Sequence, residues 1–269
     1  MLSKLFNKVK SENRSALITF VSCGDPTIAF SERLIERICK SGADIVEIGV
    51  PFSDPMADGK VIESASKRAI VSGTTLEKVI AMVKRLRNKG VENPFVLFSY
   101  YNPIYKYGLE KVASECADAR IDAMIVVDVP LEESEEITSV ISPKGINFIP
   151  LASPMTSLER IENMTASASG FLYYVSVAGV TGVRGRLPEG IADRLADVRK
   201  VSHIPVAIGF GISTPEMALE ASKIADAVVV GSRIVAMAHE NLVKCGEEFA
   251  LDEIEKFVKS LSEQMRHDL

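Results

Sequence analysis

The chain has 269 residues, of which 47% are hydrophobic and 25% are charged, with a formal net charge of -5. These proportions exclude a disordered, collagen-like or disulfide-stapled chain and are typical of a globular protein. The chain contains no run of five like charges and no apolar run near the roughly 20 residues of a membrane helix. We therefore expect neither nucleic-acid binding nor insertion into a membrane.

The first residues predict a helix rather than a targeting signal. Their apolar positions recur at helical spacing with lysines between them, at Leu2, Leu5, Phe6 and Val9. A signal peptide would instead carry an unbroken apolar stretch. We expect a cytoplasmic protein that begins with an amphipathic helix.

The cysteines indicate neither a metal site nor disulfides. They are far apart in the chain, form no Cys-x-x-Cys motif and are accompanied by only 3 histidines. We expect no bound metal, and reduced, mostly buried thiols at Cys23, Cys39, Cys116 and Cys245.

Short apolar segments bounded by turn residues predict eight strands, separated by segments with apolar residues at helical spacing. Near-continuous apolar strands are typical of a parallel sheet that helices cover. This alternation predicts an α/β fold, a single (β/α)8 TIM barrel. The predicted strands are ALITFVSCG from Ala16, ADIVEIGVP from Ala43, PFVLFSYY from Pro94, DAMIVVDVP from Asp122, INFIPLASP from Ile146, FLYYVSVAG from Phe171, IPVAIGFGI from Ile204 and DAVVVGS from Asp226.

An open doubly wound sheet is the alternative fold, because it also alternates strands and helices. The chain has no Gly-x-Gly-x-x-Gly fingerprint, since IGFGIS is followed by Thr214 where the third glycine would stand. No linker divides the sequence, so we expect one domain over residues 1–269. Extra helices are expected after Gly59 and in LDEIEKFVKSLSEQM near the end, besides the one at the N-terminus.

Reacting groups of a barrel lie at the carboxyl ends of its strands and on the loops that follow. Glu47 lies within the apolar strand segment VEIGV, and Asp54 and Asp58 lie on the loop after it. Burial disfavours an ionised carboxylate, which suits a group that both gives and takes protons, so Glu47 is the leading acid/base candidate. A Glu that is hydrogen-bonded inside the barrel is as good a reading of the sequence alone, and aspartates beside Pro and Gly commonly form turns.

Glycines gather in the last three loops between a strand and a helix. They are Gly179 and Gly182, Gly209 and Gly211, and Gly231 before Ser232. Backbone N–H groups and a helix N-terminus in these loops form the usual phosphate site of a barrel, which indicates a phosphorylated small substrate. Any one of these glycines could instead serve a tight turn.

Polar residues at other strand ends are further candidates. One of the neighbours Tyr173 and Tyr174 must face inward, and Tyr100 ends the third strand. Asp128 ends the fourth. Tyrosines at such positions contact substrate in some barrels, but more often they pack in the core.

Together these strings resemble the tryptophan synthase alpha subunit family. The match runs in order through the predicted strands, and its most specific part is the long segment PFSDPMADG. The strings that carry it are EIGVPFSDPMADG from Glu47, YYNP from Tyr100, VVDVPLEE from Val126, YYVSVAGVTG from Tyr173 and IGFGIS from Ile208.

The resemblance implies a lyase that cleaves indole-3-glycerol phosphate to indole and glyceraldehyde 3-phosphate, without a metal or cofactor in this subunit. It implies that Glu47 is the acid/base group, that Asp58 accepts the indole N–H, and that Tyr173 positions Glu47 or the substrate. The residues that it implies for binding of the phosphate or substrate are Gly182, Gly211, Gly231, Ser232 and Tyr100.

The resemblance also implies a partner, a pyridoxal-phosphate-containing beta subunit that consumes indole in an alpha2beta2 heterotetramer. The segments implied to dock it are Asp54–Pro55 and Asn102–Pro103.

The chain departs from the family pattern near its active-site loops, at Val177, in VRGRLP after AGVTG, at Lys60 and at Ser66. Two other functions therefore stay open. One is a weakly catalytic or non-catalytic subunit that activates the beta subunit. The other is a different phosphosugar-binding barrel enzyme, although no lysine stands at a strand end here.

Overall fold

The computed structural model describes residues 1–175, 187–209 and 211–267. Its strands form a single sheet in which every pair of neighbours is parallel. The strands are β1 (Ala16–Ser22), β2 (Ile45–Gly49), β3 (Phe95–Ser99), β4 (Ala123–Val126), β5 (Asn147–Phe148), β6 (Leu151–Ala152), β7 (Leu172–Val175), β8 (Val206–Gly209) and β9 (Ala227–Val230).

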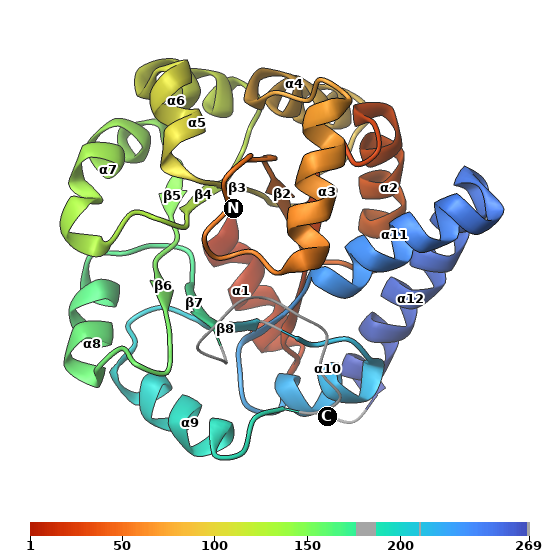
Figure 1. Ribbon diagram of the computed structural model, residues 1–269. Helices are drawn as coiled ribbons and strands as arrows, with labels where there is room; N and C mark the ends of the chain where they lie inside the picture. The colour runs from red at the N-terminus through yellow and green to blue at the C-terminus, as the bar shows by residue number, and fades with distance from the viewer. Residues whose placement is uncertain (176–186, 210, 268–269) are drawn as a thin grey trace.

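The sheet closes into the predicted barrel. In the order β5-β4-β3-β2-β1-β9-β8-β7-β6, the two end strands are separated by only Ile149 and Pro150 along the chain. The Ile149 N–H donates to the carbonyl of Met124 in β4, and the Pro150 carbonyl accepts from the Tyr173 N–H in β7. The fifth predicted strand is thus split in two, and the ring closes across it (Figure 1).

Side chains alternate between the barrel interior and the surrounding helices, as strand geometry requires. Ile18, Ile45 and Val96 point into the interior cluster. Their neighbours in sequence, such as Val46 and Leu97, pack beneath the helices. The alternation places Glu47, two residues after Ile45, on the inward face.

The helices surround this ring (Figure 1). Within the described residues, none is long and apolar enough to cross a membrane. The helices are α1 (Leu2–Ser11), α2 (Ile28–Lys40), α3 (Lys60–Val71), α4 (Leu76–Asn88), α5 (Tyr101–Tyr107), α6 (Leu109–Asp118), α7 (Glu135–Ile141), α8 (Leu158–Ala166), α9 (Ile191–Val201), α10 (Pro215–Ser222), α11 (Ser232–Cys245) and α12 (Glu247–His267), with short 3-10 turns at Leu131–Glu133 and Ser142–Lys144.

Several helices begin where a hydroxyl can accept a backbone N–H of the first turn. Thr27 accepts from Phe30, and Thr75 accepts from Lys78. The same cap is made by Ser157 at α8 and Thr214 at α10. Thr214, which interrupts the glycine fingerprint of a dinucleotide site, therefore has a structural role.

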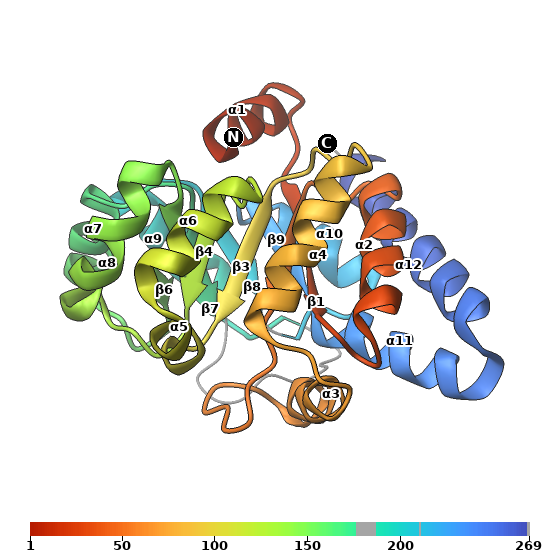
Figure 2. The ribbon, with the colours of Figure 1, turned by 90° about the horizontal axis from the view of Figure 1, so that it is seen from above.

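The predicted N-terminal helix α1 covers the amino-terminal end of the barrel. Leu2, Phe6 and Val9 join the interior cluster, and the rings of Phe6 and Phe171 are 5.9 Å apart between centroids. In Figure 2, α1 lies at one end of the barrel and α3 at the other. The end of the barrel that α1 leaves uncovered is therefore the end near α3.

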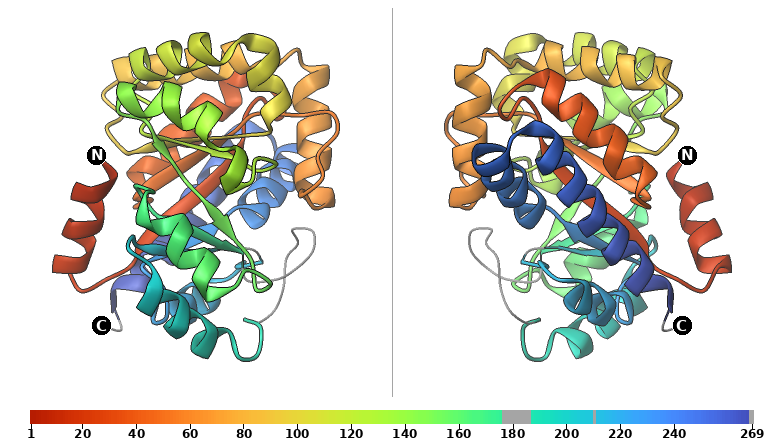
Figure 3. Two further views of the ribbon diagram at one scale, coloured as in Figure 1. Left: turned by 90° about the vertical axis from the view of Figure 1, so that its left-hand side faces the viewer. Right: turned by 90° about the vertical axis from the view of Figure 1, so that its right-hand side faces the viewer.

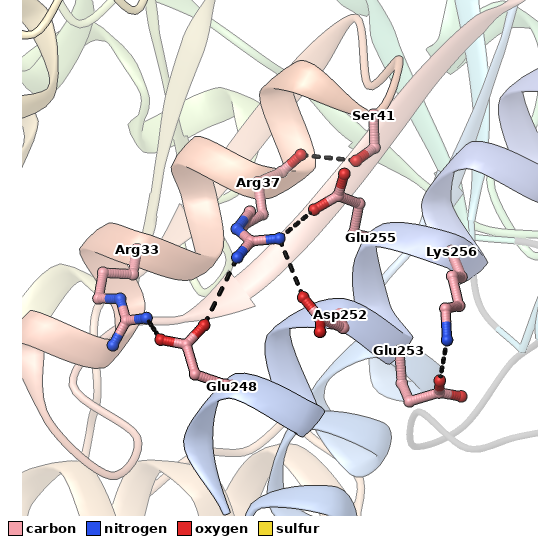
Figure 4. A network of polar contacts seen from close by, with 8 residues as sticks. All are labelled: Arg33, Arg37, Ser41, Glu248, Asp252, Glu253, Glu255 and Lys256. Atoms are coloured by element: carbon pink, nitrogen blue, oxygen red, sulfur yellow. Dashed lines mark hydrogen bonds and ion pairs between the residues drawn. The ribbon is translucent and has the colours of Figure 1, made fainter.

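Of the other two predicted extra helices, α3 begins directly after Gly59, and α12 packs beside α2 on the outside of the barrel (Figure 3). Arg37 of α2 contacts Asp252 at 3.0 Å and Glu255 at 2.5 Å, and Arg33 pairs with Glu248 (Figure 4). These charges are partly exposed, so each pair contributes at most about 1 kcal/mol. Apolar residues such as Leu251, Ile254 and Val258, which are fully buried, hold α12 in place.

Candidate active site

One cavity at the carboxyl end of the strands gathers most of the predicted site residues. Its empty volume, which includes space open to solvent, is about 530 Å³. The predicted residues that line it are Glu47, Asp58, Tyr173, Gly211, Gly231 and Ser232. They come from four strands or the loops that follow them, β2, β7, β8 and β9, which the closed ring of strands brings together.

Glu47 is completely buried in β2, between Phe20 of β1 and Val96 of β3 in the strand register. Within the described part of the chain, neither of its carboxylate oxygens has a hydrogen-bond partner. Burial without such a partner raises the pKa of Glu47 to about 8. The side chain is therefore protonated at neutral pH and can give a proton to a ligand in the cavity.

Asp58 lies on the loop between β2 and α3 and faces the same cavity. Burial is the main cause that raises the pKa of Asp58 to about 6, with a smaller effect from Glu63, while a hydrogen bond from Tyr100 opposes the shift. At neutral pH Asp58 is therefore mostly ionised while Glu47 is not. Two carboxyl groups with different protonation states at one site are typical of acid/base chemistry.

Tyr100 stands behind Asp58 and outside the set of described residues that line the cavity. Its hydroxyl accepts the Ala57 N–H at 3.0 Å and is hydrogen-bonded to Asp58. The structure therefore places Tyr100 as a support for the loop that carries Asp58. Contact between Tyr100 and the substrate stays a prediction.

Tyr173 is the inward member of the Tyr173–Tyr174 pair. It belongs to the interior cluster, whereas Tyr174 packs under the helices. Burial and, second, the nearby charge of Glu47 hold the pKa of Tyr173 well above its ordinary value. Tyr173 is therefore neutral at neutral pH, and it lies close enough to Glu47 for the charge of an ionised Glu47 to raise its pKa.

Gly209 at the end of β8 makes room for Tyr173. A Cβ at this position would lie 2.5 Å from the Tyr173 hydroxyl oxygen and 2.9 Å from its ring. We predict that Gly209→Ala pushes the buried ring away from its place beside Glu47 and lowers kcat about tenfold, because a small misplacement in a site is costly. Steady-state kinetics and thermal unfolding of the variant measure the effect.

The background Tyr173→Phe gives the control for this change. It removes the atom closest to the added methyl group, so Gly209→Ala should cost less activity there than in the parent chain. An equal loss in both backgrounds would show that Gly209 acts through some other contact.

The last strands supply a candidate anion site opposite Glu47. Gly211 has a φ of +90°, which favours glycine, and Gly231 precedes the first residue of α11, Ser232. A Cβ on Gly231 would be only 3.0 Å from the Phe20 Cβ, so a larger residue would crowd the cavity wall. The helix N-terminus offers unpaired N–H groups to an anion. Gly182 and Gly179 lie outside the described residues.

The apolar wall of the cavity was not predicted from the sequence. Phe20 and Phe98 pack edge to face with ring centroids 5.3 Å apart, and Ile62, Val127 and Val229 extend this surface. Phe20 is two residues beyond the inward-facing Ile18, so the alternation of β1 is the signal that could have found it. A flat aromatic ligand suits this wall.

The two predicted docking segments lie at the same end of the molecule. The rings of Phe52 and Tyr100 are 5.1 Å apart, so the loop that holds Asp54 and Pro55 covers the start of α5, where Asn102 and Pro103 lie. Two neighbouring apolar side chains are exposed here, Met56 at 75% and Tyr105 at 67%. Another candidate, Asp128, accepts the Tyr101 N–H at 2.8 Å and so has a structural role in starting α5.

Comparison with known proteins identifies the family. The family model "Tryptophan synthase alpha chain" matches residues 6–266. The chain belongs to this family.

Two tryptophan synthase alpha chains are similar to this chain over most of its length. That of Citrifermentans bemidjiense is 45% identical over 87% of each chain, and that of Pelobacter propionicus is 41% identical over 97% of this chain and 96% of its own. The crystal structure from Legionella pneumophila superposes with a TM-score of 0.91 at 32% identity, covering 99% of this chain and 97% of that one.

Membership of the tryptophan synthase alpha chain family makes the chain a carbon–carbon lyase of tryptophan biosynthesis. Its reaction is the cleavage of indole-3-glycerol phosphate to indole and glyceraldehyde 3-phosphate. The alternative of a different phosphosugar-binding barrel is therefore excluded.

Two of the departures from the family pattern lie on α3. Lys60 is the first residue of α3, and Ser66 is buried in the same helix. Val177 and the first four residues of VRGRLP, 183–186, lie outside the described residues. Within the described residues, no group of three His, Cys, Asp or Glu side chains could hold a metal ion.

Proposed function

We propose that Glu47 and Asp58 perform the cleavage in the cavity at the carboxyl end of the barrel, with the phosphate of the substrate held by Gly211, Gly231 and Ser232. One observation carries the proposal. A buried carboxyl group that is protonated at neutral pH shares its cavity with an ionised one and with the N-terminus of α11.

The first step adds a proton to the indole ring. Glu47 gives its proton to C3 of the indole, and the positive charge that results is shared with the ring nitrogen. Asp58 accepts a hydrogen bond from that N–H and so stabilises the charge. The walls formed by Phe20 and Phe98 exclude water around these groups, which strengthens the interaction.

The second step breaks the bond between C3 and the glycerol carbon. Glu47, now ionised, removes the proton from the hydroxyl on that carbon, which becomes the aldehyde of glyceraldehyde 3-phosphate. The electron pair of the broken bond returns to the indole ring and neutralises it. One proton has been given and one taken, so Glu47 ends as it began and no external oxidant or reductant is needed.

The pH dependence of this mechanism follows from the two carboxyl groups. Glu47 must start protonated and its pKa is about 8, while Asp58 must be ionised and its pKa is about 6. We predict that kcat rises with pH near 6 and falls again near 8. The fall in kcat near pH 8 is the informative part of the profile. The rise near pH 6 does not isolate Asp58, because the phosphate monoester of the substrate also ionises near pH 6. A rate that stays constant from pH 7 to 10 would contradict the role of Glu47.

Release of indole from indole-3-glycerol phosphate by the purified chain, alone and with a beta subunit, tests the function as a whole. We expect turnover in both conditions. Absence of turnover in both, together with activation of the beta subunit that is unchanged by Glu47→Gln, would support the non-catalytic activator instead.

We further propose that the chain docks a pyridoxal-phosphate-containing beta subunit through Asp54, Pro55, Asn102 and Pro103, forming an alpha2beta2 heterotetramer. The exposed Met56 and Tyr105 beside these residues support an interface. A solved alpha2beta2 tryptophan synthase complex from Pyrococcus furiosus contains a chain that superposes with a TM-score of 0.83 at 32% identity, covering 92% of this chain and 98% of that one. The proposal includes three further points. The chain forms a single barrel domain, it works in the cytoplasm, and it carries no cofactor of its own.

A further inference from the structure

A second large cavity lies at the end of the barrel opposite the active site. It is a groove with a volume of about 550 Å³, between α1 on one side and the ends of α9 and α10 on the other. Figure 2 shows α1 at this end, away from α3 and the loops of the active site. The proposed mechanism uses none of the residues that line it.

The groove carries positive charge although the chain as a whole has a net charge of -5. Of the ionisable residues that line it, Asp226 is the one carboxylate, and it faces the cations Lys10, Arg14, Arg199 and Lys223. The arginines are already paired. Arg14 binds Asp44 through two contacts of 2.7 and 2.8 Å, and Arg199 binds Asp226 at 2.8 Å.

The two lysines of the groove, unlike its arginines, are not paired with a carboxylate of the described residues. Within the described residues, Lys10 of α1 and Lys223 at the end of α10 form no ion pair and no side-chain hydrogen bond, and both are exposed. They lie on opposite sides of the groove, because α1 forms one side and the end of α10 the other. Further hydrogen-bonding side chains line the groove, those of Asn7 in α1, Asn13 just after α1, and His203 on the other side.

We propose that this groove binds a small polyanion of the oligophosphate class, with Lys10 and Lys223 supplying the charge from its two sides. A single phosphate fills only a small part of a cavity of this size, whereas a chain of phosphates can reach both lysines. Binding ties α1 to the barrel, so the bound form is more stable toward unfolding than the free form.

Titration calorimetry of the full chain with inorganic tripolyphosphate tests the proposal, with and without saturating glycerol 3-phosphate to occupy the active site. We expect binding in both conditions, weakened as NaCl is raised. We also expect the double variant Lys10→Gln and Lys223→Gln to bind about tenfold or more weakly. The matched control is Lys144→Gln, which removes an exposed lysine outside the groove and should bind like the parent chain.

Three results would overturn the proposal. They are no measurable binding of tripolyphosphate, loss of binding when glycerol 3-phosphate is present, and equal binding by the parent chain and the double variant. The last result would mean that the lysines only stabilise the ends of their helices. Repeating the titration with ATP distinguishes the sources of the anion: equal affinity supports a free oligophosphate, and tighter binding of ATP supports a nucleotide.

Discussion

Replacement of Glu47 by glutamine should lower kcat for cleavage of indole-3-glycerol phosphate by about 10³ to 10⁴-fold, at the upper end of what general acid–base catalysis supplies. Glutamine has nearly the same shape but cannot give a proton to C3 of the indole or take one from the hydroxyl. Because the proposed phosphate site consists of Gly211, Gly231 and Ser232 and does not include Glu47, binding of glycerol 3-phosphate should persist. Single-turnover kinetics and calorimetry with glycerol 3-phosphate measure the two effects.

The same variant has a second, independent signature in its stability. The pKa of Glu47 is raised from an ordinary value of 4.5 to about 8, so the folded state holds this proton more tightly than the unfolded state does. The stability that this contributes is complete below pH 4.5 and is lost as the pH rises through 8. Glutamine does not ionise, so the Glu47→Gln variant does not lose stability as the pH rises. At pH 9 its free energy of unfolding should exceed that of the parent chain by on the order of a few kcal/mol.

Urea denaturation at pH 6 and pH 9 measures this difference. A near-normal rate of cleavage would remove Glu47 from the mechanism. A stability difference that does not change with pH would show that its carboxyl group is not buried in protonated form. The two results are separable, because the second does not depend on the substrate.

Replacement of Asp58 by asparagine should lower kcat by about 10² to 10³-fold, comparable to the loss of one group that stabilises charge in a transition state. Asparagine can still contact the indole N–H through its carbonyl, but it has no negative charge to balance the charge of the protonated ring. KM should change little, because this charge develops only during the reaction.

The control for Asp58→Asn is Asp118→Asn, which alters an exposed aspartate at the end of α6, away from the cavity. It should retain the parental rate. If Asp58→Asn lowers kcat less than about threefold, Asp58 is a turn residue of its loop rather than a catalytic group, as its neighbours Pro55 and Gly59 would also allow.

Most of the fold could be predicted because each strand is a short apolar segment and each helix repeats its apolar residues at helical spacing. The division of the fifth strand could not. It depends on how Ile149 and Pro150 share their backbone groups between two neighbouring strands, and a proline has no N–H to donate. The residues around positions 149 and 150 do not by themselves predict which neighbouring strand each backbone group will bind.

The site was predictable where residue chemistry is unusual for its position. A carboxylate inside an apolar strand, as at Glu47, is conspicuous, and so are glycines clustered after the last strands. Phe20 and Phe98 look like ordinary core residues, and alternation along a strand assigns them to the cavity wall only once the inward face of that strand is known. The inward member of the Tyr173–Tyr174 pair was undecidable for the same reason, since alternation needs a reference residue of known orientation.

The central claim is that the proton donor on β2 and the anion site on the last strands face each other across one cavity. A crystal soaked with glycerol 3-phosphate tests it most directly. We predict phosphate density at the backbone of Gly211, Gly231 and Ser232, with the glycerol directed toward Glu47. Density at another place, with these glycines empty at saturating ligand, would contradict the claim.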